Sequence, residues 1–450
     1  MNDLGAPRPA VGRQLGDLKI IQWLNRIPAW LFVALPVAVG IAERSLWNLM
    51  RTAQEEHSEA LNVAVAFAQG HGFADAFKVG QGPTAHILPI SPAVAGTVYA
   101  LFGVGSATSE FLLGCWSIGL AVGTYFLLFR AFEHLGSARV ARLLALAFGC
   151  MAPTYLAQEA VDFRIWEGGL AVFLCALFLE RLLTALANEQ LSTRVLAGIS
   201  LIAALLFFVN PVLGVGAYLC AAVACLQRLH GVQILRTIAL ATLILAIFLV
   251  PWVIRNQFAL GSPVLLRSNA GLEITLANYP GALDPIDPQQ RFMHRLQEIH
   301  PFSSESNYQA MLRAGGEVAY SRQLGSATWH WIGANRWTTM KTALLHLRQL
   351  FAPQSWQFKL SGSGLLAGFR AGLASLIGLL GLVGIARALV LRQRQWVFPA
   401  LLVLAPALCF SLFQPVPRYT YLFYPILIFC AADLFTPRHR QRIGHTPVQA

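Results

Sequence analysis

Charged side chains are scarce in this sequence. Only 12% of its 450 residues carry a charge, whereas 56% are hydrophobic, and the mean hydropathy is +0.57. Soluble globular proteins contain about 25% charged residues, so this composition excludes that class. The chain is therefore predicted to be an all-α polytopic membrane protein.

Cysteines are few, and they lack the spacing that metal or disulfide chemistry needs. All seven lie inside apolar stretches, and no pair has metal-site spacing or a position suited to an external disulfide. We interpret them as small buried hydrophobic residues.

Negative charge is in the minority, with 21 Asp and Glu against 33 Lys and Arg and a formal net charge of +12. The basic residues collect in short segments between apolar stretches, where they set membrane topology, and they do not form a track along which a phosphate backbone could run. Membrane lipids are therefore expected partners, and nucleic acid is not.

The N-terminal segment lacks a small-residue cleavage site after a short hydrophobic stretch. It also carries basic residues before the first long apolar stretch, at Arg8, Arg13, Lys19 and Arg26. We expect residues 1–27 to be a retained cytoplasmic segment and not a removed signal peptide.

About ten apolar stretches are long enough to cross a bilayer, which takes about 20 residues. They lie near residues 28–48, 107–130, 138–155, 163–184, 194–209, 211–228, 234–254, 365–390, 396–413 and 418–436. The segment 91–103 is apolar but too short, and we predict an interfacial or re-entrant helix there.

Arginines mark every second connection between these stretches, which places those connections and both termini in the cytoplasm. The transmembrane region 28–254 then contains a first extracytoplasmic loop, 49–106, which we expect to be catalytic. A large extracytoplasmic loop, 255–364, precedes the C-terminal transmembrane helices 365–436 and a cytoplasmic tail, 437–450. Long loops are usually functional, so the function is expected on this outer face.

The second long loop is predicted to begin where an apolar helix stops at Pro251-Trp252. Further along, residues 316–335 look like an amphipathic helix that lies on the membrane surface with Trp329 and Trp331 at headgroup level. Both long loops are thus expected to carry interfacial helices.

Three glutamates, Glu55, Glu56 and Glu59, stand close together in the first loop. Helical spacing would bring Glu59 to the same side as either of the others. Such a cluster at a membrane interface is either a solvated helix end or poised for chemistry. His86, later in the loop, could donate to a phosphate or simply bind a backbone carbonyl.

Several short motifs occur in a fixed order along the chain. The first loop contains an acid, N-x-A, G-x-GF and GPTAH, here Glu59, Asn62, Ala64, Gly70, Gly72-Phe73 and Gly82-Pro83-Thr84-Ala85-His86. The second contains PWxxRNxxxxG, SNxG and GE-x-AY, here Pro251-Trp252, Arg255-Asn256, Gly261, Ser268-Asn269, Gly271, Gly316-Glu317 and Ala319-Tyr320. The last is RY with a later proline, at Arg418-Tyr419 and Pro425.

In their order and placement these motifs resemble the bacterial GT-C glycosyltransferases, membrane enzymes related to protein O-mannosyltransferases and to the transferase that adds aminoarabinose to lipid A. The resemblance covers about residues 45–430. The chain departs from the family in having Glu55-Glu56 where many relatives have Asp, and Trp166-Glu167 where relatives often have Trp-Asp.

The resemblance implies an inverting glycosyltransferase of the bacterial inner membrane. Such an enzyme moves a sugar from a polyprenyl-phosphate donor to a lipid, protein or glycan acceptor at the extracytoplasmic face. An attacking hydroxyl needs a base, here Glu56 or Glu59 with Glu55 next. The leaving phosphate needs cationic or N–H donors in a partly dry site. The candidates for that role are Arg255, Arg267, Arg418 and His86.

The remaining candidate residues complete the expected site. Asp162 or Glu167 would bind or position the acceptor as a second acid. Close backbone approach to the ligand is expected at Gly82, Asn256, Asn269 and Gly271. No cofactor is certain. A divalent metal ion stays open because some relatives use one, although no His and carboxylate spacing demands it.

Two other functions and one simpler interpretation stay open. A transporter or flippase of a lipid-linked glycan would place ionisable groups within its spans and show two related halves, neither of which is visible here. A glycan ligase or polymerase would share the large outer loop. Arg255 and Arg418 also stand where interfacial arginines extend to lipid headgroups.

Overall fold

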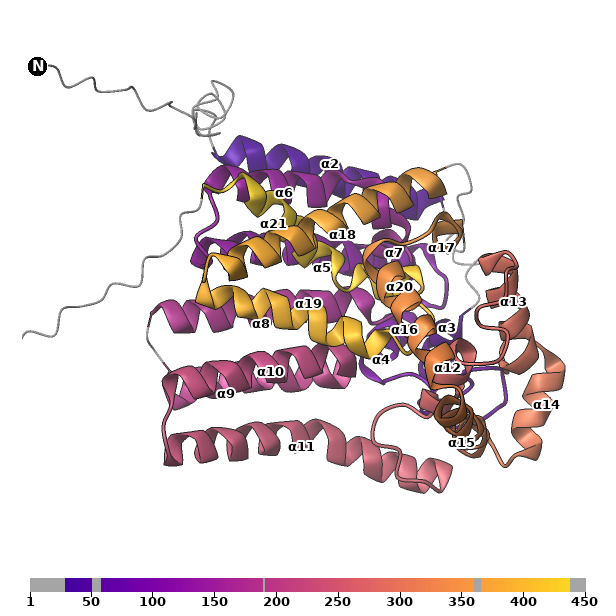
Figure 1. The fold of residues 1–450 in the computed structure, drawn as a ribbon. Coiled ribbons are helices and arrows are strands. Elements are labelled where there is room, and N and C mark those ends of the chain that lie inside the picture. The colour runs from indigo at the N-terminus through magenta and orange to yellow at the C-terminus, as the bar shows by residue number, and fades with distance from the viewer. Residues whose placement is uncertain (1–28, 51–57, 189–190, 360–365, 438–450) are drawn as a thin grey trace, which may run out of the picture.

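The structure, a computed structural model, describes residues 29–50, 58–188, 191–359 and 366–437. Within these ranges it is helical, and the only β-type pairing there is an isolated bridge between Ala74 and Pro83. Long helices lie side by side in a bundle, and shorter helices gather at one end of it (Figure 1).

Long helices lie at six of the ten predicted spans. Among the described residues, six helical segments are long and apolar enough to cross a membrane: α5 (Ala107–His134), Arg139–Ala160, α8 (Gly168–Ala187), α10 (Pro211–Arg228), α11 (Val232–Leu260) and α18 (Ala367–Val390). The segment Arg139–Ala160 comprises α6 (Arg139–Met151), η3 (Pro153–Tyr155) and α7 (Leu156–Ala160). The other predicted spans coincide with α2 (Ala29–Met50), α9 (Thr193–Val209), α19 (Val397–Phe410), and α20 (Pro417–Tyr421) with α21 (Tyr424–Ala432).

Local chemistry fixes where several of these helices begin. The hydroxyl of Ser106 accepts a hydrogen bond from Ser109 N at the start of α5, and Ser192 does the same for Val195 N at the start of α9. Asn210 caps α10, whose first residue is Pro211. A proline at the first position of a helix loses no helical hydrogen bond. α10 can therefore begin directly after α9, with only Asn210 between the two helices.

The end of α11 differs from the prediction. The helix continues through Pro251 and stops at Leu260, followed by Gly261 in the left-handed conformation with φ of 65°. Proline removes a single backbone hydrogen bond, and side-chain contacts of Trp252, Arg255 and Asn256 hold the turn beyond it. Gly261 then ends the helix as an αL cap.

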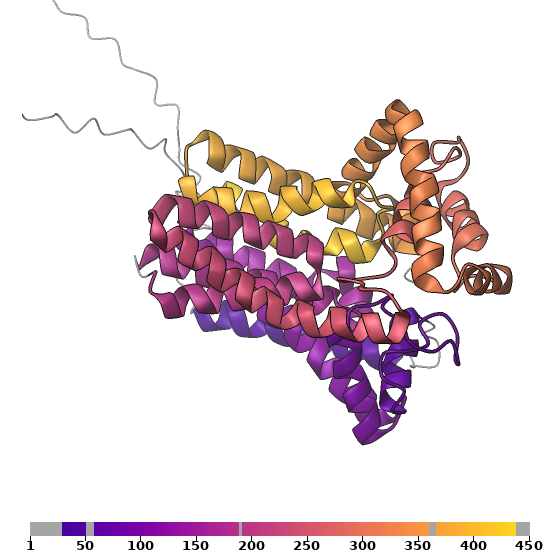
Figure 2. The same ribbon diagram turned by 90° about the horizontal axis from the view of Figure 1, so that it is seen from below.

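Both long loops fold into helices at the same end of the bundle (Figures 1 and 2). The first loop supplies α3 (Glu59–Ala68) and α4 (Ile90–Phe102), which confirms the short helix predicted at 91–103. The second supplies α12 (Ala270–Ala277), α13 (Pro288–Ile299), α14 (Glu305–Arg313), α15 (Glu317–Ala334), α16 (Arg336–Phe351) and α17 (Ser355–Lys359). α15 is the predicted helix at 316–335.

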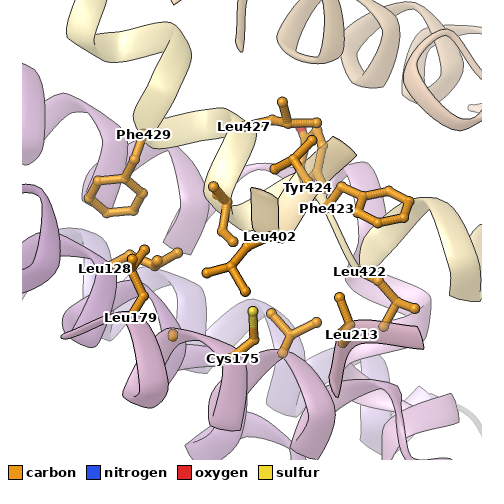
Figure 3. Close-up of a cluster of buried hydrophobic side chains, with 14 of the residues drawn as sticks. Leu128, Cys175, Leu179, Leu213, Leu402, Leu422, Phe423, Tyr424, Leu427 and Phe429 are labelled. Carbon is orange, nitrogen blue, oxygen red and sulfur yellow. The ribbon is translucent and has the colours of Figure 1, made fainter. Parts of the chain in front are cut away.

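The bundle core is apolar and includes cysteine (Figure 3). Cys175 lies buried among Leu128, Leu179, Leu213 and Leu402, which come from four different helices. Cys150, Cys220 and Cys430 are buried as well, whereas Cys115 is exposed on the bundle surface. All seven cysteines are free. Four of them are buried, and for these four the interpretation as small buried hydrophobic residues holds.

A buried polar network crosses this core. Arg44 on α2 forms an ion pair with Glu159 on α7 at 2.5 Å, and the hydroxyls of Tyr125 and Tyr421 each donate to Glu159 at 2.8 Å. Arg44 also donates to Cys150 O at 2.6 Å. α7 folds inward against α2 and α5, which buries Glu159.

Breaking this ion pair should destabilise the fold. Glu159→Gln leaves the Arg44 guanidinium buried without its counter-charge, which costs about 3 kcal/mol. The thermal midpoint of the purified protein, followed by tryptophan fluorescence, should therefore fall clearly. Glu298→Gln is the control because Glu298 is 42% exposed in its pair with Arg295, and its midpoint should barely move. Equal midpoints for the two variants would contradict a structural role for the pair.

Candidate active site

A cavity of about 550 Å³ lies where the two loops meet the end of the bundle. Its wall draws on α3, α12, α13 and α20, and on the segment between α7 and α8. Seven of the side chains predicted for the site line it: Glu59, His86, Asp162, Glu167, Arg267, Asn269 and Arg418. Two further ionisable residues, Glu273 and His300, line it as well.

Glu59 is the first residue of α3 and reaches the cavity from the helix start. Ser58 caps the helix by accepting a hydrogen bond from Leu61 N at 3.2 Å. The carboxylate thus sits at the N-terminal end of α3. Its side chain is 16% exposed, and Oε1 lies 3.7 Å from His300 Nε2. The other two predicted bases, Glu55 and Glu56, lie outside the described residues.

His86 is buried at the end of the first loop, beside the ring of Phe77. Burial lowers the pKa of His86 well below its usual value, and the nearby His300, Arg267 and Arg418 lower it further. The imidazole is therefore neutral at physiological pH and can offer an N–H donor or a nitrogen lone pair.

His300 follows directly after α13 and was not predicted for the site. Phe302 N donates to its Nδ1 at 3.3 Å, which leaves Nε2 to face Glu59. The local sequence gives no signal for it, because the stretch 284–308 reads only as polar and charged. His300 belongs to the site because it lies close to Glu59, which is more than 200 positions away in the sequence. A contact between such distant residues leaves no local sequence pattern.

Two guanidinium groups enter the cavity from different elements. Arg267 forms an ion pair with Glu167 at 2.5 Å, and Glu167 is the residue just before α8. Arg418 on α20 lies 3.7 Å from the ring centroid of Trp166. The Trp166-Glu167 motif thus orients both cations, and Asp162 lines the same wall.

Glu273 on α12 is a second carboxylate in the cavity that the sequence analysis missed, although it lies just beyond the SNxG motif. Asn269 Nδ2 donates to its Oε1 at 3.2 Å. Burial raises the pKa of Glu273, while His300, Arg267 and Arg418 oppose that rise. The cavity therefore holds carboxylates with different environments, an arrangement typical of sites that divide acid and base roles.

Arg255 does not line the cavity. Its guanidinium donates to Thr84 O at 2.7 Å and to Phe73 O at 2.6 Å, and it lies over the rings of Phe73 and Trp252. These contacts fasten α11 to the first loop.

Gly82, Asn256 and Gly271, predicted to approach the ligand, also have partners in the protein. Gly82 has a φ of 89° and exchanges hydrogen bonds with Asp75 in a turn. Asn256 donates to Val264 O at 2.9 Å. A Cβ on Gly271 would lie 1.9 Å from Ser321 O, so this glycine lets α12 and α15 come into contact. Of the predicted backbone positions, Asn269 is the one that lines the cavity.

Glu317, at the start of α15, joins the two loops. Its carboxylate accepts hydrogen bonds from Thr84 Oγ1 at 2.6 Å, Ala85 N at 2.7 Å and Gln81 Nε2 at 3.2 Å. Burial raises its pKa, and these donors oppose the rise. Because Ala85 and His86 are adjacent, this contact sets where the His86 ring enters the cavity.

Glu59, His86 and His300 together fit a divalent cation. Each offers one ligand atom, and the three atoms lie within 4.8 Å of one another. Carboxylate and imidazole ligands suit zinc or a similar transition metal. The three residues come from three separate segments, which explains why no spacing in the sequence indicated such a group.

Neither a protein-family model nor the sequence of a curated protein matches this chain. Two solved structures resemble it over 92% of its length. One is the archaeal oligosaccharyltransferase AglB from Archaeoglobus fulgidus in complex with an inhibitory peptide and a dolichol-phosphate, with a TM-score of 0.50 and 13% identity. The other is ArnT from Cupriavidus metallidurans bound to undecaprenyl phosphate, with a TM-score of 0.34 and 15% identity over 78% of ArnT.

The chain spans half the length of AglB, and at 13% identity the likeness concerns the fold. In this chain the fold combines a bundle of long apolar helices with loop helices gathered at one end, as Figure 1 shows. The protein is therefore similar in fold to AglB, and this likeness is consistent with the GT-C resemblance of its motifs.

Proposed function

We propose that the protein is an inverting membrane glycosyltransferase that moves a sugar from a polyprenyl-phosphate donor to a lipid, protein or glycan acceptor. The observation that carries the proposal is the cavity, which is lined by Glu59, Arg267 and Arg418 together. A base and phosphate-binding cations are the two requirements of this chemistry. The lipid phosphates bound to AglB and ArnT are consistent with it.

In the proposed reaction an acceptor hydroxyl attacks the anomeric carbon of the sugar. Glu59 takes the hydroxyl proton as the new carbon–oxygen bond forms. The bond from the anomeric carbon to the phosphate oxygen breaks, and the electron pair leaves with the lipid phosphate. Attack from the opposite side inverts the anomeric centre. The proton, the bond and the leaving group thus each have a partner in the cavity.

The departing phosphate gains negative charge, which Arg267 and Arg418 would stabilise. Their positions are set before the substrate binds, by Glu167 and by the ring of Trp166. Preorganised donors of this kind act without reorganisation in the transition state. The neutral His86 would add an N–H donor.

Asp162 and Glu167 are proposed to position the acceptor, since both line the cavity wall formed by the bundle. A divalent ion held by Glu59, His86 and His300 would supply positive charge beside the reacting groups. We further propose that the cavity end of the bundle faces away from the cytoplasm of a bacterial cell, in the inner membrane, because the arginine-rich connections lie between the other helix ends.

Removing the proposed base should abolish sugar transfer and leave the fold intact. We expect Glu59→Gln to lower kcat about 100- to 10,000-fold, the usual contribution of a general base. Transfer would be measured in vesicles with a labelled polyprenyl-phosphate sugar and a crude envelope acceptor. Glu298→Gln, an exposed carboxylate on α13, is the control and should retain full activity.

A fully active Glu59→Gln variant would contradict the assignment of the base. Lipid translocation by the wild-type protein without any sugar transfer would contradict the glycosyltransferase itself, and would favour the transporter alternative.

The two arginines Arg418 and Arg255 should respond differently to substitution. Arg418→Gln removes a charged donor from the cavity, so we expect the KM for the donor to rise about 10- to 100-fold with an unchanged thermal midpoint. Arg255→Gln removes two hydrogen bonds to the first loop, so the thermal midpoint should fall. Donor titrations and thermal unfolding of both variants distinguish these effects. A raised KM with an unchanged midpoint for Arg255→Gln would instead support the sequence prediction that Arg255 binds the donor.

A further inference from the structure

The helix α16 presents an exposed stripe that the proposed reaction does not use. Trp337, Met340 and Leu344 are 73%, 45% and 59% exposed, at positions i, i+3 and i+7 of the helix. Lys341 and Arg348, at i+4 and i+11, are exposed on the same side. We call these five residues the α16 stripe.

The sequence on both sides of the α16 stripe carries no negative charge. The sequence contains no Asp or Glu between Glu317 and Asp433. Arg336, next to the stripe at the start of α16, adds a third exposed cation. A surface that combines large apolar side chains with cations alone fits a partner that is both apolar and anionic.

The C-terminal end of α16 packs beside membrane helices. A Cβ on Gly378, in the middle of the 24-residue α18, would lie 2.0 Å from Phe351 O. Ser375 Oγ donates to Pro353 O at 3.3 Å, and His346 Nδ1 lies 3.1 Å from Ser411 O just after α19. One end of α16 therefore lies against α18, a helix long and apolar enough to cross a membrane.

The other end of α16 lies at the corner with α15, which stands out sideways from the bundle (Figure 2). α16 therefore lies where the long apolar helices meet the loop helices. In a membrane that holds the long helices, this position is close to the headgroup layer.

We propose that the α16 stripe binds the anionic phospholipid headgroups of the leaflet on the cavity side. Trp337 lies at the headgroup layer, where indole rings are favoured, and Met340 and Leu344 enter the acyl region. Arg336, Lys341 and Arg348 extend their side chains to lipid phosphates. Because α16 also contacts α20, which carries Arg418, bound lipid steadies one wall of the cavity.

Hydrogen–deuterium exchange of the full chain in nanodiscs tests this proposal. Backbone amides of residues 336–351 should exchange more slowly in nanodiscs that contain phosphatidylglycerol than in nanodiscs of phosphatidylcholine alone. Each cation near a charged surface contributes enough to slow local opening about fivefold. The difference should shrink at high ionic strength because salt screens exposed charges.

Single variants locate the effect on the stripe. Lys341→Gln should lose about fivefold of the lipid-dependent protection, and the triple variant with Arg336→Gln and Arg348→Gln should lose nearly all of it. Arg313→Gln, an exposed arginine at the end of α14, is the matched control and should keep the full difference.

Equal exchange in the two kinds of nanodisc would overturn the proposal. So would an equal loss in Arg313→Gln and Lys341→Gln, because the effect would then reflect overall charge. If the triple variant does not fold, the salt dependence of the wild-type protein decides the matter, since a salt-insensitive difference excludes contact with phosphate charges.

Discussion

The site depends on one buried carboxylate. Glu317 belongs to the second loop, yet its hydrogen-bond donors Gln81, Thr84 and Ala85 all belong to the first. A carboxylate out of water costs several kcal/mol unless donors replace the lost solvent. The first-loop donors reach Glu317 only when the two loops are docked together. The burial of Glu317 therefore favours the conformation of the first loop that supplies these donors.

A second contact enforces the same conformation from the bundle. Arg255 binds the carbonyl oxygens of Phe73 and Thr84, so the first loop is held by α11 on one side and by α15 on the other. His86 follows directly and has little freedom. The bundle core contributes too, because Tyr421 on α20 donates to Glu159 and so fixes the short helix that carries Arg418.

Much of the fold could be predicted because it follows from local sequence. Apolar stretches of the right length indicate membrane helices. Motifs indicated Glu59, His86 and Arg418, and Arg267 was predicted beside the SNxG motif; all four line one cavity. The motifs could not show which way a side chain points. Arg255 belongs to as clear a motif as Arg418 does, but its side chain points from α11 toward the first loop.

What the sequence could not show was contact between distant segments. Glu59 meets His300, and Glu317 meets Thr84, across more than 200 residues. Nothing near His300 or Glu273 marks them as different from other polar residues of the second loop. The pairing of Arg44 with Glu159 was missed for the same reason, since the two residues are 115 positions apart in the sequence.

The contact of α12 with α15 also limits how wide the cavity can be. Gly271 and Gly325 lie against each other, and a Cβ on Gly325 would come within 2.8 Å of Gly271 Cα. α12 carries Asn269 and Glu273 on the cavity wall, so its distance from α15 determines how much room remains between those side chains and the bundle. A single methyl group at either glycine would push α12 toward the cavity. The volume of the cavity is thus set partly at a helix crossing outside it.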